Sequence, residues 1–279
     1  MNKYTFDNIK DFDLTHIFEC GQCFRWVPAD DGSGDYIGAA GSYAARISFE
    51  KGSGAEGGRL EIEATGGSRE FWYDYFDLGT DYSAIKAELA ASDPAIEAAM
   101  EYGAGIRILR QDLFETIISF IISQNNNIPR IRKNIESICA KYGEYIGEAF
   151  GRDWHAFPTP EALSSAEVQD LMDLRLGYRA PYLKAAGERY LTCPAPEARE
   201  DILAYLGIGP KVANCIMLFG LRCTEAFPVD TWVRHIMNDM YGFDEADAKG
   251  MMDFAAKKFG NNAGYAQQYL FYYYRDSGR

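Results

Sequence analysis

The segment Gly207-Ile208-Gly209-Pro210-Lys211 constrains the fold of this chain more than any other stretch. Two glycines one residue apart let the backbone turn sharply and come close to another chain. Pro210 suits the first position of a helix, because its φ is already helical and its missing N–H would be unpaired there. The stretch 203–215 therefore predicts a helix, a tight turn and a second helix. Free N–H groups at the start of the second helix can hold a phosphate, so Gly207 and Gly209 are candidate contacts to a DNA backbone.

Lys211 falls in the first turn of this second helix. The helix dipole and apolar neighbours are both expected to lower the pKa of an amine at that position. A nucleophilic lysine has to be neutral, so the placement suits a nucleophile. An ordinary solvent-exposed helix lysine is the alternative. Further along, Asp230 follows Pro228-Val229 and can cap the next helix, and its carboxylate could also serve an active site.

The chain changes character near residue 105, which predicts an α+β protein with domains at 1–105 and 106–279. The second part has helical periodicity, and Asp112 to Ser123 is apolar almost all round, as in a buried central helix. Strands are expected at 24–26, 43–49 and 59–63, with glycine-rich turns at 31–34 and 51–54. Further helices are expected at 82–91, from Pro94, and at 129–142, 181–190, 198–206, 211–220, 230–241, 246–259 and 263–274.

The formal net charge of −13, from 41 acidic and 28 basic residues, counts against a nucleic-acid partner. Proteins that bind DNA usually present a basic surface to the phosphates. The charge is uneven along the chain, however, so the sequence is compatible with a local basic face on an acidic body. The basic residues gather at Arg107, Arg110, Arg130, Arg132, Lys133, Arg175, Arg179 and Lys184.

Hydropathy and cysteine content exclude several other classes. No apolar run reaches the roughly 18 residues of a membrane span, and the N-terminus has neither a signal core nor an arginine-rich leader. We therefore expect no membrane partner and an intracellular location, in the cytoplasm or nucleoid. Six cysteines are too sparse for a disulfide scaffold. Cys20 and Cys23 have the spacing of a zinc or redox half-site, but no second half completes it, so neither a metal nor a cofactor is expected.

The hairpin, Lys211 and the Pro-Val-Asp segment that ends at Asp230 together resemble the helix-hairpin-helix DNA glycosylase superfamily. The resemblance implies that Lys211 attacks the sugar C1′ carbon and that Asp230 supports the lysine and the developing positive charge. It also implies a fold, in which an N-terminal antiparallel β-sheet domain with flanking helices precedes an all-α glycosylase core. The four-cysteine iron–sulfur pattern of the endonuclease III branch is absent from the sequence.

Two further blocks resemble the 8-oxoguanine DNA glycosylases. Gly21 to Trp26 resembles their GQ-x-FRW segment, which implies that the Gly21 carbonyl accepts a hydrogen bond from N7–H, present in 8-oxoguanine but not in guanine. Residues 264–271 resemble their C-terminal helix, which implies that Gln267 reads the Watson–Crick edge and Phe271 stacks on the flipped base. Cys215, one turn after Lys211, would lie on the other face of the base, and its position predicts a lowered thiol pKa. Phe271 could equally be a core residue.

The segments 123–130 and 176–180 resemble the asparagine triplet and the GYRA loop of the same family. The resemblance implies that Tyr178 wedges into the base stack, while Asn125, Arg130 and Arg179 hold the orphaned cytosine. Helix caps and solvated arginines are the alternative for these positions. One departure concerns Trp232, which stands where the family often has a phosphate-contacting histidine.

Together these features predict a bifunctional DNA glycosylase and AP lyase that excises 8-oxoguanine, preferably opposite cytosine, from double-stranded DNA. Base flipping and a lysine Schiff base would carry the reaction, and we expect the protein to act as a monomer. Two alternatives stay open, a glycosylase of other base specificity on the same scaffold and a non-catalytic hairpin that only holds DNA. Lys211 argues against an alkylbase glycosylase, because those enzymes typically lack the lysine.

Overall fold

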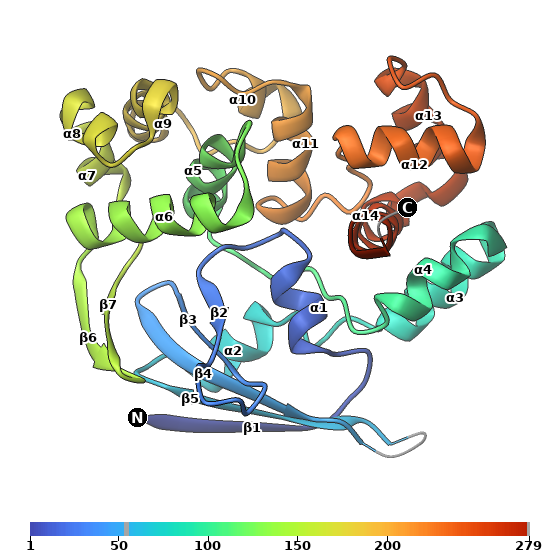
Figure 1. Ribbon diagram of the computed structural model, residues 1–279, viewed down its shortest axis with the longest axis horizontal. Helices are drawn as coiled ribbons and strands as arrows, with labels where there is room; N and C mark the ends of the chain where they lie inside the picture. The colour runs from blue at the N-terminus through green and yellow to red at the C-terminus, as the bar shows by residue number, and fades with distance from the viewer. Residues whose placement is uncertain (53–55, 278–279) are drawn as a thin grey trace.

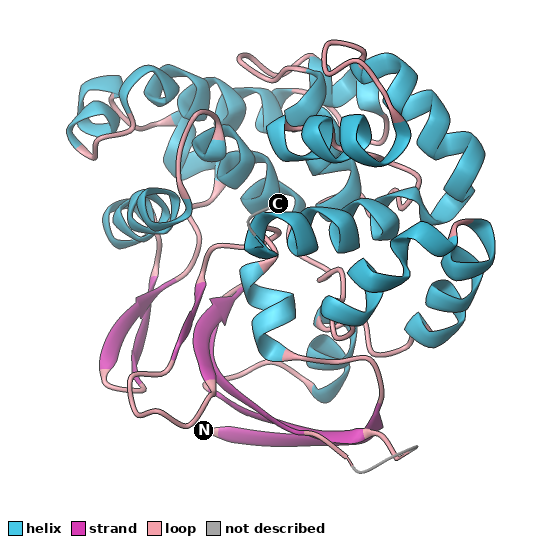
Figure 2. Ribbon diagram, turned by 45° about the vertical axis from the view of Figure 1, so that its right-hand side comes forward, coloured by secondary structure: helices cyan, strands magenta, loops and turns pink. Residues whose placement is uncertain are grey.

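The computed structural model describes residues 1–52 and 56–277. A β-sheet forms one layer of the molecule and the helices form the other, with α1 (Leu14–Glu19) between them (Figure 1). Figure 2 shows the strands gathered at one side beneath the helices. The fold class predicted from the sequence is therefore confirmed, and the glycine turn predicted at 51–54 reaches beyond the described residues.

The N-terminal sheet has five antiparallel strands in the order β1-β5-β4-β3-β2. Burial alternates along the fifth strand, where Leu60, Ile62 and Ala64 are buried and Arg59 and Glu61 are exposed, so one face of the sheet supports a core. The strands are β1 (Asn2–Ile9), β2 (Trp26–Pro28), β3 (Tyr36–Ala40), β4 (Tyr43–Glu50) and β5 (Gly58–Ala64).

The helical layer is built around α5 (Leu113–Ser123), in which eight of the eleven residues are buried. Most predicted helices are present to within two residues at each end, but the one predicted at 198–206 ends at Leu203 and the one predicted at 263–274 continues to Ser277. The other helices are α2 (Arg69–Tyr75), α3 (Tyr82–Ser92), α4 (Glu97–Tyr102), α6 (Ile128–Tyr142), α7 (Pro160–Ser164), α8 (Val168–Asp173), α9 (Ala180–Thr192), α10 (Arg199–Leu203), α11 (Pro210–Phe219), α12 (Thr231–Tyr241), α13 (Ala248–Phe259) and α14 (Ala263–Ser277). Short 3₁₀ turns lie at η1 (Pro94–Ile96), η2 (Gly177–Arg179) and η3 (Gly260–Asn262).

A β-hairpin that the sequence did not predict interrupts the helical part. Its strands, β6 (Tyr145–Ala149) and β7 (Arg152–His155), extend from α6 toward the N-terminal sheet (Figure 1). Trp154 and Ala149 pack there against Ala39 and Ala44 of the sheet. The helical part is therefore not all-α, because a short hairpin is needed to cover the outer face of the sheet.

Hydrogen bonds of Gln22, next to Gly21, connect the sheet layer to the segment that leads into the helices. Its amide nitrogen donates to the carbonyls of Ile17, at 2.9 Å, and Arg107, at 2.7 Å, and its side-chain oxygen accepts from the Leu109 N–H at 2.8 Å. A fully buried glutamine with both ends paired fixes the position of the neighbouring residues.

Helices α3 and α4 pack into the helical core, and the domain boundary at 105 stays a prediction. No helix in the described part is long and apolar enough to span a bilayer.

Candidate active site

Two glycines shape the hairpin between α10 and α11. Gly207 has φ of +81°, and a Cβ there would lie 2.4 Å from Cδ2 of Tyr182, so only glycine fits. Gly209 is the N-cap of α11 with φ of −97°, and a Cβ there would meet no heavy atom of the described chain within 4 Å. The turn is thus closed on the protein side and open on the outer side, where the first N–H groups of α11 are available to an anion.

Lys211 lies in the first turn of α11, with its Nζ 6.0 Å from the centre of the Phe120 ring. Cys215, one turn further on, and Asp230 both raise the pKa of Lys211, Cys215 contributing most, and burial opposes them. The predicted lowering is therefore wrong for the DNA-free protein, because the interactions with Cys215 and Asp230 outweigh the effect of burial. The predicted lowering for Cys215 is also wrong, because burial raises the pKa of its thiol.

Lys211 and Asp230 share a cavity of about 390 Å³ with Asn125. Asp230 caps α12, where its carboxylate accepts from the Val233 N–H at 2.9 Å, so the predicted capping role is confirmed. The cavity is lined by Ser123, Gln124, Asn125, Lys211, Val212, Val229, Asp230, Thr231 and Arg234. The sequence analysis missed Arg234, although its spacing of one helical turn from Asp230 was a usable signal.

The residues expected to recognise a base come from opposite ends of the chain. Gly21 has φ of +82°, and a Cβ there would lie 3.5 Å from Cε1 of Phe271, so the open side of the glycine faces that ring. Gln267 is buried one turn before Phe271 and accepts from the side-chain amide of Gln268 at 2.7 Å. The side-chain oxygen of Gln268 is buried and makes no hydrogen bond in the described chain, a feature that the sequence did not reveal. Phe271 is only partly buried, so it is not a core residue.

The asparagine and GYRA segments contact each other through Arg179. This guanidinium is buried and donates to the carbonyls of Gln124, at 2.9 Å from Nε, and Asn125, at 3.0 Å from Nη2. The Tyr178 ring is 49% exposed, and its hydroxyl donates to the Gln124 carbonyl at 3.2 Å. Asn125 itself has φ of +47° and is exposed. Tyr178 is thus exposed beside the asparagine segment, and Arg179 holds the loop that presents Asn125.

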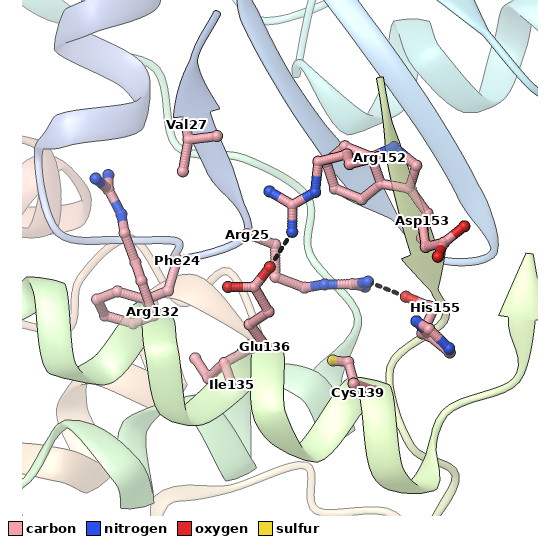
Figure 3. Close-up of a pocket in the computed structure, with 12 residues that line it drawn as sticks. Phe24, Arg25, Val27, Arg132, Ile135, Glu136, Cys139, Arg152, Asp153 and His155 are labelled. Atoms are coloured by element: carbon pink, nitrogen blue, oxygen red, sulfur yellow. Dashed lines mark hydrogen bonds and ion pairs between the residues drawn. The ribbon is translucent and has the colours of Figure 1, made fainter. Parts of the chain in front are cut away.

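A second cavity, of about 220 Å³, lies between the N-terminal sheet, α6 and the β6–β7 hairpin (Figure 3). Its charged groups contact one another, since Arg25 donates to the His155 carbonyl and Arg152 pairs with Glu136. Burial raises the pKa of the Cys139 thiol to about 11, which makes it a neutral group. This cavity joins the layers, and the residues that line it include neither Lys211 nor Asp230.

The cysteine pair is buried beside Gly21. Burial raises the pKa of Cys20 to about 12 and that of Cys23 well above its usual value, so both are neutral thiols at neutral pH. Within the described residues no group of three or more His, Cys, Asp or Glu side chains could hold a metal. Trp232 lies in the first turn of α12 and is 39% exposed, at the helix end that Asp230 caps.

Two family models match consecutive parts of the chain. Residues 6–117 match the N-terminal domain of 8-oxoguanine DNA glycosylase, and residues 118–261 match the HhH-GPD superfamily of base excision DNA repair proteins. This chain belongs to the 8-oxoguanine DNA glycosylase family. The hairpin, Lys211 and Asp230 described above therefore lie in the superfamily domain, and Gly21 lies in the domain specific to the 8-oxoguanine enzymes.

Relatives of this glycosylase match both of its domains. A probable N-glycosylase/DNA lyase of Methanothermobacter thermautotrophicus is 33% identical over 75% of this chain and 74% of its own length. The N-glycosylase/DNA lyase of Saccharomyces cerevisiae is 32% identical over 84% of this chain and 69% of its own. The 8-oxoguanine glycosylase/lyase of Clostridium acetobutylicum, solved with double-stranded DNA containing cytosine opposite 8-oxoguanine, is 39% identical with a TM-score of 0.90, over 100% of this chain and 97% of that one.

Proposed function

We propose that this chain removes 8-oxoguanine from double-stranded DNA and prefers a site in which cytosine lies opposite the lesion. It is a DNA glycosylase with lyase activity, as its family membership and its N-glycosylase/DNA lyase relatives indicate. The observation that carries the proposal is the single cavity that holds Lys211 and Asp230, at the start of the helix whose open turn can hold a phosphate.

Lys211 is the proposed nucleophile. Its neutral amine forms a bond to C1′ as the bond from C1′ to the base breaks, and the departing base keeps that electron pair and takes up a proton. Loss of a proton from the nitrogen frees a lone pair, which forms the C1′=N double bond of the imine as the C1′–O4′ bond breaks. The ring oxygen O4′ keeps that electron pair and takes up a proton, so the sugar ring opens. Loss of the C2′ proton then breaks the bond from C3′ to the 3′ phosphate, which leaves with the electron pair. Asp230 supports the cationic sugar and the cationic nitrogen on the way. Since Cys215 and Asp230 together raise the pKa of Lys211 in the free protein, the amine has to lose a proton before it attacks.

Recognition of the base is assigned to residues from the two ends of the chain. A flipped base is proposed to enter beside Gly21, whose carbonyl would accept from N7–H, and to stack on Phe271. Gln267 would read its Watson–Crick edge. A guanine presents a lone pair at N7, so it would meet the carbonyl oxygen with an acceptor and be rejected.

A borohydride trap tests the proposal directly. Incubation with an 8-oxoguanine:cytosine duplex and borohydride should give a covalent protein–DNA adduct, and Lys211→Gln should abolish both the adduct and base release. Lys249→Gln, which removes an exposed lysine of α13, is the matched control and should keep both. A stable adduct with Lys211→Gln would disprove the assignment of the nucleophile. A duplex that is bound but never loses its base would favour the non-catalytic hairpin.

The protein is also proposed to act as a monomer, in the compartment that holds the DNA. The two layers together supply a complete set of candidate residues within one chain, from Gly21 to Phe271, so the proposed reaction needs no second copy. Sedimentation at micromolar concentration with and without duplex would test the oligomeric state.

A further inference from the structure

A groove of about 730 Å³ lies beside the catalytic cavity, between α6 and the loop that follows α8. Asn125 lines the catalytic cavity and Asn127 lines the groove, so the two spaces meet at the asparagine loop. Its charged lining residues are Arg130, Lys133, Asp173 and Arg175, and only Arg130 had a role predicted from the sequence.

Three exposed cations, Arg130, Lys133 and Arg175, face this groove without a carboxylate partner in the described part of the chain. Other cations of α6 are paired, Arg132 with Glu19 at 2.8 Å and Lys141 with Asp170 at 3.3 Å. The groove also contains one carboxylate, Asp173, which accepts from the side-chain amide of Gln169 at 2.8 Å. Three exposed cations without an ion pair therefore gather around one groove that contains a single carboxylate.

The backbone at Arg175 is a second, independent observation. Its φ of +63° lies in the left-handed region, which disfavours every residue with a Cβ except where the surroundings enforce it. Arg130 reinforces this conformation, because its guanidinium donates to the Arg175 carbonyl at 3.5 Å. Glycine would fit the backbone better, so the arginine side chain is retained at a conformational cost.

We infer that this groove binds backbone phosphates of the DNA strand opposite the lesion, through Lys133 and Arg175. The inference rests on the proposed function, which brings the lesion-strand sugar to Lys211. Tyr178 follows Arg175 by three residues and is exposed, so a ring inserted into the stack there would separate the two strands' paths. The lesion strand then lies on the catalytic side of the asparagine loop, and its partner lies over the groove. Phosphates are the ligands that a solvent-exposed set of Lys and Arg side chains binds best.

The salt dependence of binding tests the inference. Each phosphate contact contributes about 0.9 to the slope of log Kd against log salt, so Lys133→Ala should lower the slope by about that amount. The affinity advantage of the parent over this variant should therefore shrink about 3.5-fold between roughly 50 and 200 mM NaCl. Arg175→Gly should lower the slope equally, although it relieves the left-handed strain and should not lower Tm. Binding is measured by anisotropy in the non-cleaving Lys211→Gln background, with an 8-oxoguanine:cytosine duplex.

Arg222→Gly is the matched control for Arg175→Gly. Arg222 is also an exposed arginine with positive φ, at +57°, but it follows the far end of α11 from the hairpin. The substitution removes the same charge and the same strain, and it should leave the slope unchanged. Equal salt slopes for the parent, Lys133→Ala and Arg175→Gly would overturn the inference. A decrease in slope in Arg222→Gly as large as that in Arg175→Gly would also overturn it.

Neutral methylphosphonate linkages identify the strand. Single substitutions placed along the strand opposite the lesion should weaken binding of the parent at one or two positions and have no further effect in Lys133→Ala. Substitutions in the lesion strand should weaken both proteins equally, and the opposite pattern would assign the groove to the lesion strand and refute the inference. These experiments measure binding, so their outcome does not depend on the proposed catalytic reaction. An undamaged duplex measured in parallel tests the proposed lesion preference separately, because equal affinity for both duplexes would refute that preference without affecting the groove.

Discussion

The open side of Gly21 faces the ring of Phe271, with 3.5 Å from a Cβ built on the glycine to Cε1 of the phenylalanine. The glycine belongs to the layer of the sheet and the phenylalanine to the last helix, so a base that stacks on Phe271 would be held between the two layers. The guanidinium of Arg275 lies 5.5 Å from the same ring and covers it in the free protein. Entry of a base is therefore expected to require a small shift of one of these side chains.

Phe271→Ala should weaken binding of a lesion duplex while leaving the fold intact. Loss of base–aromatic stacking costs about 1–3 kcal/mol, or roughly 5- to 150-fold in affinity. The ring is partly exposed, so its removal creates little buried cavity. Duplex affinity and Tm are measured side by side, and Phe271→Trp should retain most of the affinity. Unchanged affinity of the alanine variant would show that Phe271 does not stack on the base and only packs against the protein.

The rate of base release should rise with pH in the wild-type protein. Cys215 and Asp230 raise the pKa of Lys211, so at neutral pH the amine is protonated, and the neutral fraction grows about tenfold for each pH unit below its pKa. Asp230→Asn removes a negative charge and should move this rise to lower pH. The same variant should lower the plateau roughly 100-fold or more, because the developing cation loses its support.

Single-turnover rates from about pH 6 to about pH 10 measure both effects of Asp230→Asn. Asparagine caps a helix nearly as well as aspartate, so the fold of α12 should be kept. An unshifted pH profile with a near-normal plateau would leave Asp230 only its structural role.

Discrimination between cytosine and adenine opposite the lesion should depend on Arg130 without a change in stability. Its side chain is exposed, and a guanidinium can engage the O2 and N3 acceptors of cytosine but meets a donor on adenine. Arg130→Ala should reduce the preference for cytosine, by roughly 5- to 150-fold at most. Single-turnover rates on duplexes that differ only in the opposite base decide this, and equal wild-type rates opposite cytosine and adenine would contradict it.

Arg179→Ala should lower Tm as well as the preference for cytosine. The guanidinium is buried and holds the carbonyls of Gln124 and Asn125, so its loss removes the hydrogen bond to Asn125 and leaves Gln124 with only the Tyr178 hydroxyl. A variant with normal Tm that binds every duplex less tightly by the same factor would instead indicate a phosphate contact for Arg179.

The two hairpin glycines should respond differently to alanine. Gly207→Ala should lower the free energy of unfolding by at least about 1–2 kcal/mol, from the left-handed backbone alone, and the Tyr182 ring would also have to move. Gly209→Ala should change stability by less than about 0.5 kcal/mol, yet weaken DNA binding, because its Cβ points into the open space where a phosphate would approach. Denaturant unfolding and duplex affinity separate these effects. Normal DNA binding by Gly209→Ala would place the phosphate elsewhere.

Long helices and local motifs could be predicted because both depend on residues that are close together in the sequence. Helix α5 is apolar all round and α11 begins at a proline, and each was placed to within one residue at its start. The β6–β7 hairpin was missed because its two-residue turn is Phe150-Gly151, with φ of +53° and +77°. Such a turn usually has asparagine or aspartate first, so phenylalanine gives no signal there.

The electrostatics of the site could not be predicted from local sequence. The pKa of Lys211 depends on Cys215, one turn along the same helix, and on Asp230 at the N-cap of α12, and the dipole argument considered neither neighbour. The role of Arg179 as a buried anchor depends on carbonyls more than fifty residues away in the chain. Arg175 belongs to no recognised sequence motif, so only its backbone conformation and its unpaired side chain in the structure indicate it as a candidate phosphate contact.

The β6–β7 hairpin has a consequence for distant parts of the molecule. Trp154 and Ala149 of this hairpin pack on the outer face of the N-terminal sheet. The helical part of the chain therefore returns to contact the sheet a second time. The tilt of the sheet against the helices is thereby fixed at two separate places, one at Gln22 and one at the hairpin. Gly21 lies beside the sheet and Phe271 lies on the last helix, so the spacing between them depends on how the two layers are held together. A substitution at Trp154, which lines neither the Lys211 cavity nor the Gly21–Phe271 contact, is therefore expected to alter that spacing.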